Sequence, residues 1–215
     1  MPRDTTRPRS PLYGLILAGR IVFLAMLAGL LILVLSERPS LLSILQGRPS
    51  TEQPLVGLVA GHWQSDSGAV CPDGLQEVDL NLSIARKVAD RLRDAGYRVE
   101  VLPEYSPKLD GYQAAAFLSI HNDSCVAGLS GYKVAPSTAL DAADASAELV
   151  ALLYAHYSES TGLKPHLNTI TVDMTDYHAW RQIDPGTPGA IIECGFMSDD
   201  RALLTEGVDR VSTGI

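Results

Sequence analysis

The sequence predicts a single α/β domain preceded by one transmembrane helix. The chain has 215 residues, enough for one domain plus appendages. From residue 55 onward, short apolar runs alternate with longer amphipathic segments. This alternation is typical of an α/β sheet covered by helices on both faces. Near the N-terminus, a mostly apolar stretch is long enough to span a bilayer.

The N-terminal 36 residues differ in composition from the rest. Residues 1–11 hold three arginines and one aspartate, and residues 12–36 are apolar or uncharged except for Arg20. A helix of about 20 apolar residues spans a membrane, and a basic flank stays in the cytoplasm. We therefore expect a single-pass signal-anchor with a cytoplasmic N-terminus and an extracytoplasmic domain. The alternative is a cleaved signal peptide and a secreted domain, although the following SERPS is a poor cleavage site.

The remaining chain divides into a linker and an acidic domain. Residues 37–54 contain three prolines and no sustained strand pattern, so we interpret them as a linker, and residues 55–215 as the globular domain. The formal net charge of the whole chain is −8, and four of its arginines precede residue 37. A domain this acidic argues against nucleic acid as a partner and against docking on anionic lipid by charge.

The hydrophobic pattern also places the individual elements. Apolar positions at helical spacing follow Glu77, and Gly96 is a suitable helix stop. Two further helices are expected, at residues 141–160 and around 200–204. The predicted strands are residues 55–60, 98–102, 115–120, 131–134 and 190–193.

Four polar residues stand at the ends of these predicted elements. His62 and His121 follow strands, Glu193 closes a strand, and Glu77 opens a helix, where the helix dipole favours an ionised carboxylate. Sites in α/β sheets collect beyond the strand ends. Two histidines and one carboxylate suit a catalytic zinc with a free position for water, and a second carboxylate can handle the proton. Each residue alone also has a structural interpretation, as a hydrogen-bonded histidine or a first-turn charge.

The sequence context of these residues resembles a known family. The segments GHWQSDSGA, QEVDLNLSIARKVADRLRDAGYRVEVL, FLSIHND and PGAIIECGFMSDDRALL occur in this order. Together they look like the zinc-dependent N-acetylmuramoyl-L-alanine amidases of the type 3 family, from about Val56 to Ile215. The combination is specific, whereas any one segment alone is not. The resemblance implies a single α/β domain with a mixed central sheet and helices on both faces.

The resemblance also implies a cofactor, a substrate and roles for the four residues. Zn²⁺ would be held by His62, Glu77 and His121, and Glu193 would be the general base for zinc-activated water. The substrate would be peptidoglycan, cleaved at the amide bond between N-acetylmuramic acid and L-alanine. The alternatives are another zinc amide hydrolase, such as a peptidase, or a non-catalytic cell-wall-binding homologue. No residue pattern names a protein activator.

Several residues are candidates for contact with the substrate. Trp63 stands where the family often has a second glycine, so it is either a stacking surface for sugar or a partly buried rim aromatic. Asn122 is a candidate to bind substrate or to orient the neighbours of His121. Arg181 would grip a stem-peptide carboxylate, with a surface salt bridge as the alternative. The segment before His121 is shorter than in relatives, which leaves the substrate range open.

Three cysteines remain to be assigned. Cys71 lies between His62 and Glu77, and Cys125 follows His121 by four residues. If the ligands converge, these two loops come close, so we expect a Cys71–Cys125 disulfide in an exported domain. A separation of the two Cα atoms beyond about 7 Å would exclude it. Cys194 is expected to pack in the sheet, and a cysteine nucleophile is the alternative there.

Overall fold

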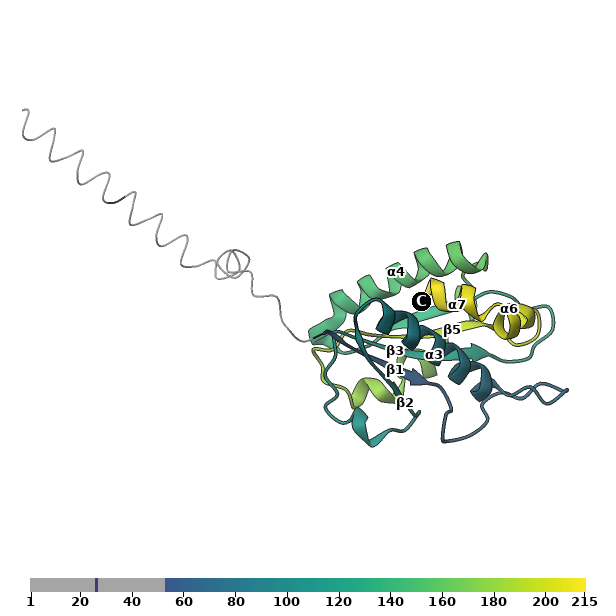
Figure 1. Ribbon diagram of the computed structural model, residues 1–215, viewed down its shortest axis with the longest axis horizontal. Coiled ribbons are helices and arrows are strands. Elements are labelled where there is room, and N and C mark those ends of the chain that lie inside the picture. The colour runs from purple at the N-terminus through teal and green to yellow at the C-terminus, as the bar shows by residue number, and fades with distance from the viewer. Residues whose placement is uncertain (1–25, 27–52) are drawn as a thin grey trace, which may run out of the picture. The chain divides into compact units, whose positions relative to one another are not determined.

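The computed structural model describes Met26 and residues 53–215 (Figure 1). The predicted N-terminal segment 1–11, the transmembrane segment 12–36 and the linker 37–54 lie outside the described residues, apart from Met26, Gln53 and Pro54. Within the described part of the chain, no helix has the length and apolar character needed to cross a membrane.

A mixed five-stranded sheet, in the order β2-β1-β3-β5-β4, forms the centre of the domain. Four strands are parallel and β4 runs antiparallel to β5. Adjacent parallel strands need a crossover connection, and the helix α3 provides it between β1 and β2. The strands are β1 (Leu55–Ala60), β2 (Arg98–Leu102), β3 (Ala116–Asp123), β4 (Lys133–Pro136) and β5 (Gly189–Phe196).

The strand boundaries match the prediction for β1 and β2 but not for β3 and β5. His121 was expected to follow its strand and Glu193 to close one, yet both lie inside strands. They are register partners in the β3–β5 ladder, which continues to Asp123 and Phe196. A parallel ladder is formed by backbone groups, so a change from apolar to polar side chains does not end it. β4 begins two residues later than expected, at Lys133.

One face of the sheet is covered by the longer helices (Figure 1). Here the larger core packs strand residues such as Leu58 and Ile120 against Ile84 and Leu153. α3 begins at Glu77 as predicted, and Gly96 follows it with a φ of 93°. The last of these helices was not predicted. Their bounds are α3 (Glu77–Asp94), α4 (Ala143–Thr161), α6 (Arg201–Glu206) and α7 (Val208–Gly214).

The opposite face carries shorter helical elements, so helices lie on both faces of the sheet, as expected. A second core of aromatic residues fills this side, with Phe117 from β3 against Tyr112, Tyr177 and Trp180. The connection 103–115 between β2 and β3 forms only the turn η1, and bulky rings cover the sheet here. The turns are η1 (Pro107–Leu109), α5 (Val172–Thr175) and η4 (His178–Arg181), while η2 (Leu140–Ala142) and η3 (Leu167–Thr169) lie in other connections.

A disulfide ties two loops at the end of the sheet. Cys71 and Cys125 are bonded, with their Cα atoms 5.4 Å apart and 54 positions apart in the sequence. Cys71 precedes α3 and Cys125 follows β3, so the bridge joins the loops that lead to Glu77 and away from His121.

Candidate metal centre

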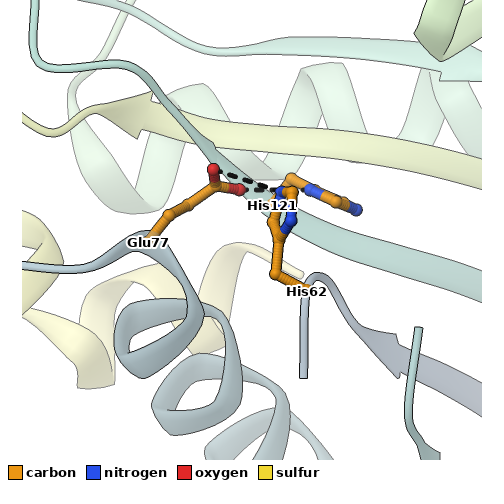
Figure 2. A group of neighbouring side chains, drawn as sticks. All are labelled: His62, Glu77 and His121. Atoms are coloured by element: carbon orange, nitrogen blue, oxygen red, sulfur yellow. Dashed lines mark hydrogen bonds and ion pairs between the residues drawn. The ribbon is translucent and has the colours of Figure 1, made fainter. Parts of the chain in front are cut away.

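Three donor side chains from three elements converge at one edge of the sheet (Figure 2). His62 comes from the turn after β1, Glu77 is the first residue of α3, and His121 lies on β3. The two oxygens of Glu77 lie 3.3 Å from His62 Nε2 and 3.1 Å from His121 Nδ1. Zinc ligands sit about 2.0–2.2 Å from the ion, which places tetrahedral ligand atoms roughly 3.3–3.6 Å apart. One ligand atom from each residue lies within 4.8 Å of the other two, so the donor set fits a zinc ion in its chemistry and is gathered closely enough to surround one.

Backbone and amide donors fix the Glu77 carboxylate. The Ala69 N–H donates to Oε2 at 3.0 Å, and Asn81, one helical turn along α3, donates to Oε1 at 3.0 Å. The backbone N–H of Asn122 reaches the same oxygen at 3.3 Å. Burial by itself would raise the pKa of Glu77, but the hydrogen bonds from His121 and His62 outweigh it and hold that pKa far below the usual range. Glu77 is thus an ionised donor at any pH of interest.

The two histidines are also held in defined orientations. Asp66 Oδ1 lies 2.6 Å from His62 Nδ1, which leaves Nε2 directed at Glu77. A carboxylate on the far ring nitrogen is the usual support of a metal-binding histidine. The ring of His121 packs over Gly61, where an added Cβ would come within 2.4 Å of His121 Cε1. Only glycine leaves room for the imidazole at that position.

The site attracts positive charge. The hydrogen bond to Glu77 raises the pKa of His62 to about 9, against the opposing effect of burial. The pKa of His121 is also raised, because Glu77 and two further carboxylates outweigh its burial. Protons and divalent cations compete for the same donor atoms, so a site that favours protonated histidines also favours a metal ion.

Glu193 stands next to His121 across the β3–β5 ladder. Its Oε2 is buried and has no hydrogen-bond partner among the residues that the structure describes. Burial raises the pKa of Glu193 to about 7, in spite of the nearby His121 and Lys133, which lower it. A carboxylate that titrates near neutral pH is suited to take and return a proton. On the other side, Lys133 of β4 is its register partner.

A cavity of about 480 Å³ opens beside these groups. Its floor includes two of the three donors and Glu193, and its walls come mainly from the segment between η3 and η4. The lining residues are His62, Glu104, Tyr105, His121, Thr171, Asp173, Met174, Asp176, Tyr177, His178, Arg181, Ile191 and Glu193. The proposed base and the donors therefore face a space that can receive a substrate.

The other candidate residues occupy different places. Arg181 lines the cavity but is exposed and forms an ion pair with Asp176, which agrees with the salt-bridge alternative. Asn122 is buried and donates through its side chain to Asn81, so it supports the Glu77 side of the site and does not line the cavity. Trp63 is partly buried against the larger core and is not a lining residue either.

The structure brings in functional residues that sequence reasoning missed. Glu104 follows β2 and lies among the histidines, and His178 of η4 lines the cavity. Asp66 contacts the donor His62, and Lys133, the register partner of Glu193 on β4, donates to the carbonyl of Thr169. The available signal for Glu104 was its position after a strand of the same parallel sheet, where side chains gather at one edge.

Cys194 has no role at this centre. Its side chain is buried in the larger core, on the sheet face opposite the cavity, and burial raises the pKa of its thiol well above the usual range. A buried, protonated thiol away from the cavity is a poor nucleophile.

A sequence model of the Amidase_3 family, described as N-acetylmuramoyl-L-alanine amidase, matches residues 56–211. The chain belongs to this family. The match covers both histidines, Glu77 and Glu193, and it extends over nearly all of the described domain.

Two curated proteins are similar to parts of this amidase-family chain. The uncharacterized protein YqiI of Bacillus subtilis is 37% identical over 95 residues, which are 40% of this chain and 46% of YqiI. The N-acetylmuramoyl-L-alanine amidase AmiC of Neisseria meningitidis is 36% identical over 81 residues, 34% of this chain and 20% of AmiC. The matched region thus spans about half of the first relative and a fifth of the second.

Solved structures of amidases share the fold. The catalytic domain of CwlV from Bacillus (Paenibacillus) polymyxa is 24% identical with a TM-score of 0.56, covering 76% of this chain and 94% of that one. Ami1 from Mycobacterium abscessus is 17% identical with a TM-score of 0.60, covering 76% and 95%. CwlD from Clostridioides difficile, solved in complex with the GerS lipoprotein, is 22% identical with a TM-score of 0.58, covering 75% and 93%.

Proposed function

We propose that this member of the amidase family is a zinc-dependent N-acetylmuramoyl-L-alanine amidase that acts on peptidoglycan. The reaction would be hydrolysis of the amide bond between N-acetylmuramic acid and L-alanine. The observation that carries the proposal is the cluster of His62, Glu77 and His121 beside the unpartnered carboxylate of Glu193, at the floor of an open cavity.

The proposed roles follow from the chemistry of each group. His62, Glu77 and His121 would hold a zinc ion, which supplies a Lewis acid for the amide carbonyl and lowers the pKa of water. Glu193 would take a proton from the attacking water and pass it to the leaving amine of L-alanine. Its unpartnered Oε2 supports this role, since a carboxylate committed to structural hydrogen bonds is less free to move a proton.

The cavity walls would receive the rest of the substrate. Tyr105 and His178 present a tilted aromatic pair with ring centroids 4.5 Å apart, and both line the cavity. Arg181 already pairs with Asp176 through Nη1, so a stem-peptide carboxylate would compete with Asp176 for this guanidinium. We therefore propose that the cavity walls as a whole contact the substrate, and we expect substitution of Arg181 to have a small effect on activity.

We further propose a membrane-anchored, extracytoplasmic enzyme with a cytoplasmic N-terminus. Residues 12–36 have the composition of a signal-anchor after a basic flank. The Cys71–Cys125 disulfide supports export, because disulfides persist in oxidising compartments. Membrane fractionation and N-terminal sequencing of the mature protein test this placement: a soluble protein that begins after residue 36 would contradict the anchor.

The test of the activity uses the full-length chain in detergent. Purified peptidoglycan is digested with and without a zinc chelator, and mass spectrometry identifies the products. The proposal expects free L-alanine amino ends and intact lactyl groups, with the reaction abolished by the chelator and restored by Zn²⁺. Cleavage inside the stem peptide would instead indicate a zinc peptidase, and binding without cleavage would indicate a wall-binding homologue.

A further inference from the structure

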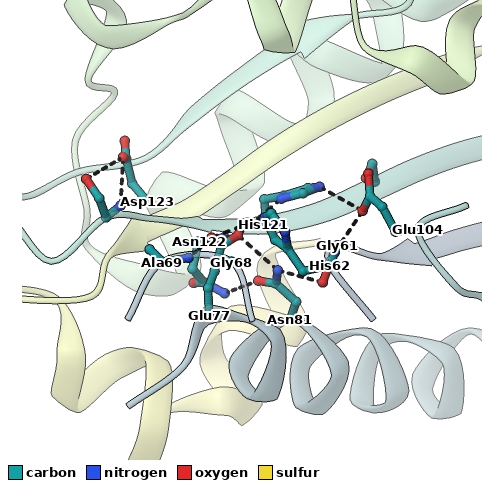
Figure 3. A network of polar contacts seen from close by, with 12 residues as sticks. Gly61, His62, Gly68, Ala69, Glu77, Asn81, Glu104, His121, Asn122 and Asp123 are labelled. Carbon is teal, nitrogen blue, oxygen red and sulfur yellow. Dashed lines mark hydrogen bonds and ion pairs between the residues drawn. The ribbon is translucent and has the colours of Figure 1, made fainter. Parts of the chain in front are cut away.

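Glu104 is a buried carboxylate at the centre of the site that the proposed reaction does not use. It lies two residues after β2, in the connection before β3, and its side chain is only 6% exposed. Figure 3 shows Glu104 on the side of His121 that faces away from Glu77. An ionised group is costly to bury unless several donors satisfy it, so its contacts show what holds it there.

One oxygen of Glu104 lies close to both histidines. Oε2 accepts a hydrogen bond from the backbone N–H of His62 at 2.8 Å (Figure 3). His62 has a φ of 65°, in the left-handed region that residues with a side chain rarely adopt. The same oxygen lies 3.6 Å from His121 Nε2, a buried nitrogen with no hydrogen-bond partner among the described residues. Since Nδ1 of His121 faces Glu77, Nε2 is the nitrogen that is left for an outer carboxylate.

The other oxygen of Glu104 is held by the cavity wall. Oε1 accepts from the Tyr177 hydroxyl and from His178 Nε2, each at 2.8 Å. Gln182 Nε2 lies 3.0 Å from His178 Nδ1, which makes Nδ1 an acceptor and leaves the ring proton on Nε2 to donate to Glu104. Ser119 of β3 donates to the Tyr177 oxygen at 3.0 Å. Both oxygens are therefore engaged, and the carboxylate has one defined orientation.

We infer that Glu104 is a positioning residue shared by both metal-binding histidines, an inference that rests on the proposed zinc site. It fixes the main chain of His62 by a hydrogen bond, and it places a negative charge 3.6 Å from Nε2 of His121, beyond hydrogen-bond distance but close enough to favour one orientation of this imidazole. Histidine ligands generally donate their second ring N–H to such a carboxylate, and Asp66 already has this place beside His62. Through Tyr177 and His178, Glu104 also connects the cavity wall to the geometry of the donor set.

The test measures metal binding, with activity as a secondary readout. The full-length chain and its Glu104→Gln variant are titrated with Zn²⁺ in competition with a chelator. Loss of an outer carboxylate costs about 10- to 100-fold in metal affinity, and we expect a weakening of that size. Co²⁺ is then bound in place of zinc, and its visible spectrum should shift in Glu104→Gln because the ligand geometry changes. Glu148→Gln, an exposed carboxylate on α4, is the matched control and should leave both readouts unchanged.

Tyr177→Phe keeps the experiment decisive if Glu104→Gln does not fold, as judged by circular dichroism. This variant removes one donor from Oε1 and leaves the contacts of Oε2, so we expect a severalfold loss of zinc affinity. If Glu104→Gln folds and has the zinc affinity and the cobalt spectrum of the wild type, the inference is overturned. If Glu104→Gln does not fold, a wild-type zinc affinity in Tyr177→Phe overturns it. In either case a wild-type chain that binds zinc keeps the proposed function intact. A wild-type chain that does not bind Zn²⁺ would instead defeat the proposed function itself.

Discussion

His121 and Glu193 are register partners on the neighbouring parallel strands β3 and β5. Each follows apolar residues of the second core, Phe117 and Ile191, at alternating positions along its strand. Side chains alternate between the two faces of a sheet, so His121 and Glu193 share the face that carries the cavity. This placement keeps the proposed base beside the metal-binding donors without making it one of them.

Replacing Glu193 by glutamine should separate catalysis from metal binding. The amide keeps the size of the side chain but cannot accept a proton, and general-base catalysis is worth about 100- to 10,000-fold in rate. We expect kcat on peptidoglycan to fall by that factor while zinc content, measured by atomic absorption, stays unchanged. Glu148→Gln provides the control for an exposed carboxylate. A Glu193→Gln protein with near wild-type kcat would rule out the assigned role.

Zinc binding should release protons near neutral pH. In the metal-free protein the hydrogen bond to Glu77 raises the pKa of His62 from 6.5 to about 9, so this imidazole is mostly protonated at pH 7.5. A ligand nitrogen must be deprotonated, and we expect release of about one proton or more per zinc ion. Calorimetric titration in buffers of different ionisation enthalpy measures this number. Identical heats in all buffers would contradict the expectation.

The same pKa shift predicts how the stability of the metal-free protein depends on pH. Because the folded-state pKa of His62 exceeds its unfolded value, the stabilisation is fully present below pH 6.5 and is lost as the pH rises through about 9. The free energy of unfolding should therefore decrease over this interval. Urea unfolding at several pH values checks the trend, and His62→Ala should remove this part of the decrease.

Removing the disulfide should lower stability without removing the metal site. In the chain-entropy model, a bridge closing a loop of this length contributes about 4 kcal/mol to the free energy of unfolding. The double variant Cys71→Ser, Cys125→Ser should lose roughly that amount in urea unfolding monitored by circular dichroism. Cys194→Ser is a poor control because Cys194 is buried, so the reduced wild-type protein serves instead. Equal stability of the oxidised and reduced proteins would argue against this contribution.

Lys133 should matter more for stability than a surface lysine does. Its ammonium lies 2.6 Å from Asp123 Oδ2 and donates to the carbonyl of Thr169 at 2.6 Å, in a buried setting. Breaking a buried pair from one side costs about 3–5 kcal/mol, so Lys133→Met should destabilise the protein by that order. Lys108→Met, which breaks an exposed pair with Glu100, should cost about 0–1 kcal/mol. Equal effects of the two substitutions would show that the Lys133 pair is not an important buried contact.

The hydrophobic pattern of a segment was sufficient to predict the bounds of those helices and strands that depend mainly on their own residues. α3 starts at Glu77 and ends before Gly96 because its apolar spacing and its stop signal are local. β1 and β2 have their predicted bounds for the same reason. β3 and β5 extend past their apolar runs, since their ends depend on pairing with each other. α7 was not predicted. Its buried residue Val211 packs in the larger core, which is formed by residues far apart in the sequence.

The sequence by itself indicated the α/β class through its hydrophobic pattern, and its resemblance to family motifs singled out the two histidines and the two glutamates. The cysteine pair followed from the expected convergence of the loops that carry these residues. Only the tertiary structure decided which groups support them. Glu104 joins the histidines through a side chain that reaches across from β2, and Lys133 lies beside Glu193 because β4 pairs antiparallel with β5. Such contacts depend on strand order and register, which arise from packing the whole chain, so the residues beside Glu104 and Lys133 in the sequence do not identify their partners.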